Sequence, residues 1–271
     1  MWTLFDPFEV KELTTLYGEE FEARYIELEN SDDNITRERV SAKNLWKEML
    51  RSYFETGNPF LTFKDTANRA NPNKHVGIIR STNLCTEIFQ NTAPNTYKTR
   101  FTFEDGTQEA YDENAMLTVD NGTTKPAKKV TALDSLNGKQ IWIVDKEKTD
   151  GDTAVCNLAS VNLANVHTQE DLKRVVPTAI RMLDNVIDLN FYPLAKVKRT
   201  NEKSRSIGLG VMGEAQMLAE NQIEWGSYDH FTKIDEVMES FSYYTIEASS
   251  NLALEKGRYP TFEGSDWSKG I

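Results

Sequence analysis

An amide, a thiol and a carboxylate occupy every second position in the stretch STNLCTEIFQNTAPN, as Asn83, Cys85 and Glu87. Side chains alternate between the two faces of extended backbone, so this spacing predicts that all three project to one side. A thiol can donate a hydrogen atom or act as a nucleophile, a carboxylate can accept a proton, and an amide can donate and accept hydrogen bonds. The pattern indicates a site for a polyol or carbonyl substrate. The plainer alternative is a buried cysteine beside a turn-forming asparagine.

The second of the two cysteines, Cys156, lies in the mostly apolar stretch TAVCNLASVNLANV. By itself this context is typical of a buried, inert core thiol. If the fold brought Cys156 to an active site, it could form half of a thiol–disulfide couple, for which Cys85 is the one other thiol in the sequence. The cysteines and the three histidines show no metal-ligand spacing, so no zinc site is predicted.

The stretch GLGVMG, residues 208–213, matches the dinucleotide fingerprint G-x-G-x-x-G. A dinucleotide site needs a good hydrophobic strand before the glycines, whereas this stretch follows the polar residues TNEKSRSI. We therefore interpret it as a tight turn in which a strand packs against the following helix.

Composition excludes several classes of protein. The chain has 271 residues, 39% of them hydrophobic, which is sufficient for a core, and a formal net charge of −11 that argues against nucleic-acid binding. We find no signal peptide and no apolar run long enough to span a membrane. Two cysteines cannot form a disulfide framework, so we expect a cytoplasmic protein.

Hydrophobic periodicity predicts helices over residues 6–25 and 40–54, and short apolar runs at 60–63 and 76–79 suggest a sheet. Farther along, a helix is predicted over 168–190, started or kinked by Pro177, then a polar loop over 196–205. A last helix is predicted over 233–255, ended by Gly257. Helices alternating with strands indicate an α/β protein.

Between these parts, residues 97–148 alternate in short segments separated by Asp-Gly and Asn-Gly pairs, which are typical of tight hairpin turns. We expect a β-rich insertion there. The resulting division is a first segment over 1–96, the insertion over 97–148 and a continuing segment over 149–271.

Five stretches resemble the large, catalytic subunit of ribonucleotide reductase, most closely the class I enzymes. They are LFDPFEVKELTTLYGEEFEARY, ETGNPFLTFKDTANRANPNKHVGIIRSTNLCTEI, AVCNLASVNL, IGLGVMG and YPTFEGSDWSKG. The resemblance implies a partial ten-stranded α/β barrel with Cys85 on a finger loop inside it. It implies that Cys85 is the thiyl-radical cysteine that abstracts the ribose 3′ hydrogen of a ribonucleoside diphosphate. Glu87 would deprotonate the 3′ hydroxyl, and Asn83 would hold the same edge of the ribose.

By the same resemblance, Cys156 is one member of the redox pair that reduces the substrate, and Leu84 and Leu158 also border the substrate. The other pair member lies upstream in the family, and the one cysteine upstream of Cys156 here is Cys85, which the resemblance assigns to the radical. The effector-binding parts, the phosphate-binding loop, the radical-relaying tyrosines and the C-terminal reducing cysteines of the family have no counterpart either. We therefore expect an internal fragment that carries the radical site and whose continuing barrel segment, 149–271, is truncated at the C-terminus.

The implied enzyme is a ribonucleoside-diphosphate reductase linked to thioredoxin or glutaredoxin. Its partners would be flanking fragments and a beta subunit that supplies a dimetal/tyrosyl radical. We expect this chain to bind no cofactor directly and to be inactive when it is isolated. Two alternatives stay open. One is a catalytically silent assembly fragment, and the other is a cobalamin-dependent reductase with the same barrel.

Overall fold

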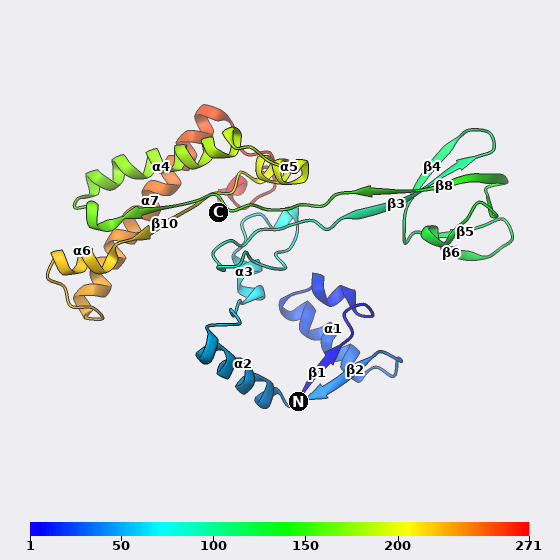
Figure 1. Cartoon of the computed structure of the whole chain (residues 1–271), viewed down its shortest axis with the longest axis horizontal. Helices are drawn as coiled ribbons and strands as arrows, with labels where there is room; N and C mark the ends of the chain where they lie inside the picture. The colour runs from blue at the N-terminus through cyan, green and yellow to red at the C-terminus, as the bar shows by residue number, and fades with distance from the viewer. Residues whose placement is uncertain (271) are drawn as a thin grey trace. The chain divides into compact units, whose positions relative to one another are not determined.

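The computed structural model describes residues 1–270 and has mixed α/β secondary structure (Figure 1), as predicted. No closed barrel is formed within these residues. The α-helices are α1 (Gly18–Asn30), α2 (Ala42–Thr56), α3 (Lys64–Ala70), α4 (Gln169–Leu189), α5 (Ala195–Ser204), α6 (Glu214–Glu220) and α7 (Tyr228–Lys256). The strands are β1 (Trp2–Phe5), β2 (Arg37–Val40), β3 (Thr96–Phe103), β4 (Gln108–Asp112), β5 (Met116–Thr118), β6 (Thr124–Pro126), β7 (Ser135–Leu136), β8 (Lys139–Thr149), β9 (Leu158–Asn162) and β10 (Gly208–Met212).

The chain forms two compact units. The first contains residues 1–92, 154–193 and 200–271, and the second contains 93–153 and 194–199. Both cysteines belong to the first unit, although residues 93–153 of the second unit lie between them in the sequence.

The N-terminal helix prediction is only partly correct. Residues 11–15 form a 3-10 helix, and α1 begins separately at Gly18, because Tyr17 has extended backbone. Helix α1 packs beside the antiparallel pair β1–β2, where the Tyr25 hydroxyl donates to the carbonyl of Thr3 and accepts from its N–H, both at 2.8 Å. Helix α2 agrees with its prediction and ends at Gly57, which is left-handed at φ +73°.

The sheet expected from the apolar runs at 60–63 and 76–79 is absent from the described residues. Helix α3 and a 3-10 turn over Lys74–Val76 occupy this region instead. The buried Asn68 accepts from the N–H of Ile79 at 2.8 Å and donates to its carbonyl at 2.9 Å. One amide side chain thus satisfies the backbone groups that a neighbouring strand would otherwise pair.

The main core of the first unit lies between helices α4 and α7 and the parallel pair β9–β10. The predicted apolar stripe of α4 is buried as expected, and α4 runs through Pro177, which does not start it. Helix α7 ends at Lys256 with Gly257 as its cap, also as predicted. The buried residues of this core are Val161, Leu172, Val176, Ile180, Phe241, Ala248 and Leu252.

The polar loop predicted over 196–205 is largely helical, because α5 covers Ala195–Ser204. The strand-to-helix interpretation of residues 208–213 is confirmed: β10 leads through Gly213 directly into α6. Gly213 has φ +77°, and a Cβ there would lie 2.1 Å from Asn162 Oδ1. The last glycine of the fingerprint therefore serves close packing.

The second unit, which we call the lobe, is β-rich. Its four-stranded antiparallel sheet has the order β4-β3-β8-β7, and β5–β6 forms a separate hairpin. Its ends are joined at Ala93, whose carbonyl accepts from the N–H of Asp152 at 2.8 Å. It has its own core of Phe101, Phe103, Val119, Ala127, Val130, Leu136 and Ile141.

Candidate functional site

Asn83, Cys85 and Glu87 lie on a tight turn, and the prediction that they share one face of extended backbone is wrong. The N–H of Thr86 donates to the carbonyl of Asn83 at 3.2 Å, and Thr86 has φ +65°. An isolated antiparallel bridge between Thr82 and Phe89 closes the base of the turn. The reversal of the backbone, which strand alternation cannot anticipate, presents Cys85 at the tip.

One side chain of this turn stabilises it by a hydrogen bond, and the others are exposed to solvent. Asn83 is half-buried, and its Oδ1 accepts from the N–H of Ile88 at 3.0 Å. Leu84 is 83% exposed, and Cys85 and Glu87 are also exposed. The thiol and the carboxylate are therefore free to meet a ligand, whereas the amide oxygen already has a partner in the turn.

Cys156 is exposed, so its interpretation as a core thiol is wrong. It lies two residues before β9, and hydrogen bonds of its neighbours hold the backbone there. The N–H of Val155 donates to Asn201 Oδ1 at 3.3 Å, and the buried Asn157 donates through Nδ2 to the carbonyl of Ser206 at 3.3 Å. Leu158, the first residue of β9, is 45% exposed.

Both cysteine-bearing segments contact the residues that lead into β10. After Cys85, Gln90 Nε2 donates to Ser204 Oγ at 2.7 Å. After Cys156, the carbonyl of Asn157 accepts from the N–H of Gly208 at 2.9 Å. A Cβ on Gly208 would lie 2.6 Å from Leu158 Cδ2 and 3.6 Å from Ile88 Cδ1. The missing side chain at 208 therefore leaves room for one apolar side chain from each segment.

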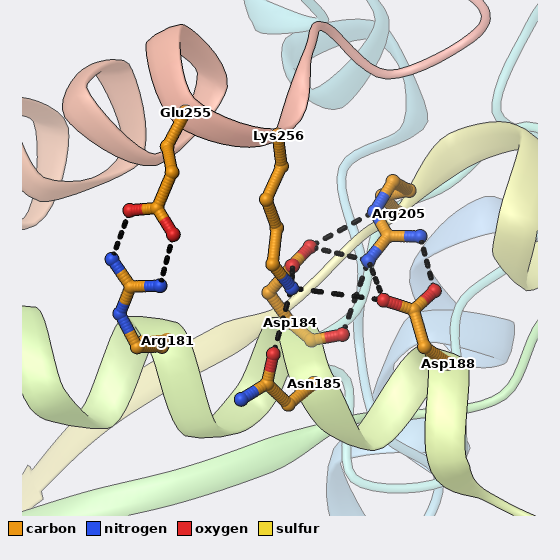
Figure 2. Close-up of polar contacts among 7 residues, drawn as sticks. All are labelled: Arg181, Asp184, Asn185, Asp188, Arg205, Glu255 and Lys256. Atoms are coloured by element: carbon orange, nitrogen blue, oxygen red, sulfur yellow. Dashed lines mark hydrogen bonds and ion pairs between the residues drawn. The ribbon is translucent and has the colours of Figure 1, made fainter.

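A cluster of charged side chains joins α4, α7 and Arg205 (Figure 2). Arg205 donates to Asp184 Oδ1 at 2.9 Å and forks onto both oxygens of Asp188 at 2.8 and 2.9 Å. Lys256 Nζ donates to Asp184 Oδ2 at 2.7 Å. The Arg205 guanidinium lowers the pKa of Asp188, and the hydrogen bond to Asp188 raises the pKa of Arg205. The carboxylates lie one turn apart on the same helix, so one guanidinium can bind both.

Sequence reasoning missed this cluster. The available signal was a pair of aspartates four positions apart, at 184 and 188, in a helix whose other face is strongly apolar. Asp184 is only 9% exposed, and an acidic group so buried requires a cation. The cluster borders a pocket of about 500 Å³, also lined by Tyr259 and Arg258.

Two classes of feature are absent from the part of the chain that the structure describes. Residues 1–270 contain no group of His, Cys, Asp or Glu side chains arranged to hold a metal ion. None of their helices combines the length and apolar character needed to cross a membrane.

Comparison with known proteins gives one consistent result. The family model described as the ribonucleotide reductase barrel domain matches residues 1–271. The alpha subunit of ribonucleoside-diphosphate reductase from Helicobacter pylori strain 26695 is 61% identical over 271 residues, which are 100% of this chain and 34% of the relative. The corresponding alpha subunits from Synechocystis and Treponema pallidum are 38% and 39% identical over 277 residues; these cover 100% and 99% of this chain and 28% and 29% of the relatives. The chain thus spans about a third of the length of these relatives.

Proposed function

The chain belongs to the ribonucleotide reductase barrel-domain family, and we propose that it carries the radical-bearing part of a ribonucleoside-diphosphate reductase catalytic subunit. The observation that supports this most directly is the exposed turn on which Cys85 and Glu87 stand, joined through Ser204–Gly208 to the segment that carries Cys156. The proposed reaction needs a thiol and a carboxylate near each other and a second thiol within reach of the same substrate.

In the proposed chemistry, a thiyl radical on Cys85 abstracts the 3′ hydrogen of the ribose while Glu87 takes the proton of the 3′ hydroxyl. Losing that proton eases the abstraction. The 2′ hydroxyl leaves as water with a proton from the thiol pair. Cys156 and a second thiol supply the two electrons and the hydrogen that replaces the hydroxyl at the 2′ carbon and become a disulfide, and Glu87 returns its proton to the 3′ oxygen. Cys85 finally returns its hydrogen atom to the 3′ carbon. Asn83, Leu84 and Leu158 would border the ribose.

We further propose that the rest of the ten-stranded barrel is supplied by flanking parts of the reductase. Several large apolar side chains support this, because they are exposed in the described residues and would be covered in a closed barrel. Examples are Phe54 at 82%, Phe63 at 76%, Leu189 at 83%, Phe191 at 83% and Leu254 at 85% exposure. The second redox thiol, effector sites and thioredoxin- or glutaredoxin-reactive cysteines would also come from those parts. We expect the isolated chain to be inactive.

The test is the formation of deoxyribonucleoside diphosphate by the complete catalytic subunit, with its radical-generating beta subunit and thioredoxin. Cys85→Ala is expected to abolish turnover while the substrate still binds, and Glu87→Gln to lower kcat by about 100-fold or more through loss of the base. Cys156→Ser is expected to stop reduction because one electron-donating thiol is lost. Lys146→Ala, an exposed lobe residue, serves as the control with unchanged turnover.

Three outcomes would contradict the proposal. Turnover by the Cys85→Ala enzyme would reject its radical role. Assembly of the complete subunit without nucleotide reduction would favour a catalytically silent module. Activity that required adenosylcobalamin in place of the beta subunit would select a cobalamin-dependent reductase.

A further inference from the structure

One short segment, Ser204–Gly208, contacts both loops that carry the cysteines. Ser204 accepts from Gln90, five residues after Cys85, and Ser206 accepts from Asn157, the residue after Cys156. The Cys85 loop is also held by the Thr82–Phe89 bridge and by Asn91 Nδ2, which donates to the carbonyl of Ile78 at 2.7 Å. The contacts with Ser204–Gly208 are those that the two loops have in common, so this segment is placed to couple their positions.

Arg205 lies in the middle of the same segment, and its side chain is fixed on helix α4. It has φ +46°, an uncommon conformation for a residue other than glycine, which persists where surrounding contacts determine it. Those contacts are five hydrogen bonds: one from the Arg205 N–H to the carbonyl of Asn201, and four from its guanidinium to Asp184 and Asp188. The guanidinium side chain is only 22% exposed.

The anchor for Arg205 is itself rigid and neutralised (Figure 2). Asp184 and Asp188 project from a helix whose apolar stripe, including Ile187, is almost fully buried. Lys256, from the end of α7, also binds Asp184 and lies 3.7 Å from Asp188, so two carboxylates face two cations. The two carboxylates can be removed from water because each has a cation beside it. The forked contact also fixes the orientation of the Arg205 guanidinium better than a single hydrogen bond would.

We propose that Arg205 is a positioning residue that fixes segment Ser204–Gly208 on α4 and thereby sets the separation and relative orientation of Cys85 and Cys156. The guanidinium reaches neither thiol loop directly. It acts through the hydrogen bonds of Ser204 with Gln90 and of Ser206 with Asn157.

The chain offers a direct measurement, since Cys85 and Cys156 are its only cysteines and both are exposed. Spin labels on the two thiols of the full 271-residue chain report the distance between the loops by pulsed electron paramagnetic resonance. Arg205→Gln removes the forked contacts. We expect it to broaden or shift the distance distribution relative to the unsubstituted chain.

The matched control is Arg181→Gln. Figure 2 shows that Arg181 also joins α4 to α7, through a forked ion pair with Glu255 at 2.5 and 2.7 Å. Within the described residues, this ion pair does not involve either loop that carries a cysteine. Arg181→Gln is expected to leave the distance distribution unchanged. An unchanged distribution in Arg205→Gln, or equal broadening in Arg181→Gln, would overturn the proposal. If Arg205→Gln fails to fold, Asp188→Asn weakens the same fork while keeping the side-chain shape, and an unchanged distribution there would equally overturn it.

The catalytic consequence rests on the proposed function and is measured separately in the complete reductase. The guanidinium of Arg205 binds α4 and is not expected to contact the substrate. We therefore expect Arg205→Gln to lower kcat by about 10- to 100-fold with little change in KM, as for a misplaced reacting group. A raised KM with normal kcat would contradict a positioning role. If the unsubstituted reductase reduces no nucleotide, the proposed function fails, whereas the spin-label distances still decide the role of Arg205.

Discussion

Gly213 lies against the side chain of Asn162: a Cβ added to this glycine would be 2.1 Å from Asn162 Oδ1. The same oxygen accepts from the N–H of Ala164 at 3.2 Å, so it caps the short turn that follows β9. The end of β9 and the residue that leads from β10 into α6 are thus packed together without space for a side chain at position 213.

We expect Gly213→Ala to destabilise the chain by at least about 1–2 kcal/mol, because alanine is strained at φ +77° and Asn162 must also move. Gly210→Ala, in the strand β10 that precedes Gly213, is the matched control: the nearest contact of its Cβ would be an ordinary 3.6 Å to Ser160 Oγ. It is expected to be neutral or stabilising by up to about 1 kcal/mol. Urea denaturation measures both, and equal effects would contradict the packing described.

Both thiols are expected to react in the folded chain. Cys85 and Cys156 are exposed, so iodoacetamide should add two groups per chain under native conditions, at rates within about tenfold of those in urea. Mass spectrometry of the alkylated peptides gives the two rates separately. Protection of Cys156 in the folded chain would show that it is buried, contrary to the structure.

The lobe should be removable. Thr96 and Thr149 are opposite each other in the β3–β8 ladder, where paired Cα atoms are about 5 Å apart, so an Asn-Gly turn can replace residues 97–148. We expect the shortened chain to retain its helical circular dichroism and cooperative unfolding. A loss of helical signal would show that the first unit depends on the lobe.

Within the lobe, Phe101 is fully buried in the hydrophobic core, so its substitution tests whether the lobe has a core of its own. Phe101→Ala should destabilise the lobe by about 3–5 kcal/mol while the helical signal of the first unit persists. If the helical signal of the first unit were lost together with the folded lobe, the two units would not have separate cores.

The contact between Arg205 and Asp188 predicts a specific pH dependence. The guanidinium lowers the pKa of Asp188 in the folded state, so folding favours the ionised carboxylate. This stabilisation is complete above the unfolded-state pKa of about 4 and is lost as the pH falls through the lower folded-state value. Asp188→Asn should therefore lower stability at neutral pH and flatten the decline below about pH 4.

Urea unfolding between about pH 2 and pH 6 measures this difference. Asp235→Asn, an exposed aspartate of α7 outside the charged cluster, is the control and should leave the acid decline unchanged. An Asp188→Asn chain that declines as steeply as the unsubstituted chain would contradict the ion pair.

The features that local pattern could predict are those in which neighbouring residues decide the conformation. The stripe from Leu172 to Ile187 identified α4, and Gly257 marked the end of α7. The Gly-containing turn before α6 was also recognised, because its polar context excluded a dinucleotide strand. By contrast, the apolar runs around Phe60 and Ile79 suggested strands that do not form. At Ile79 a single buried side chain, Asn68, binds the backbone N–H and carbonyl in place of a neighbouring strand.

The amino-acid sequence alone determined the family, the α/β class and the residue types of the candidate site, because motifs and periodicity are local properties of the chain. Only the tertiary structure decided that Cys85 stands on a turn, that Cys156 is exposed, and that Arg205 fixes the segment between their loops. The contact from Gln90 to Ser204 spans 114 positions of sequence. Loops without regular hydrogen bonding take their conformation from such distant partners, and no short-range pattern encodes them.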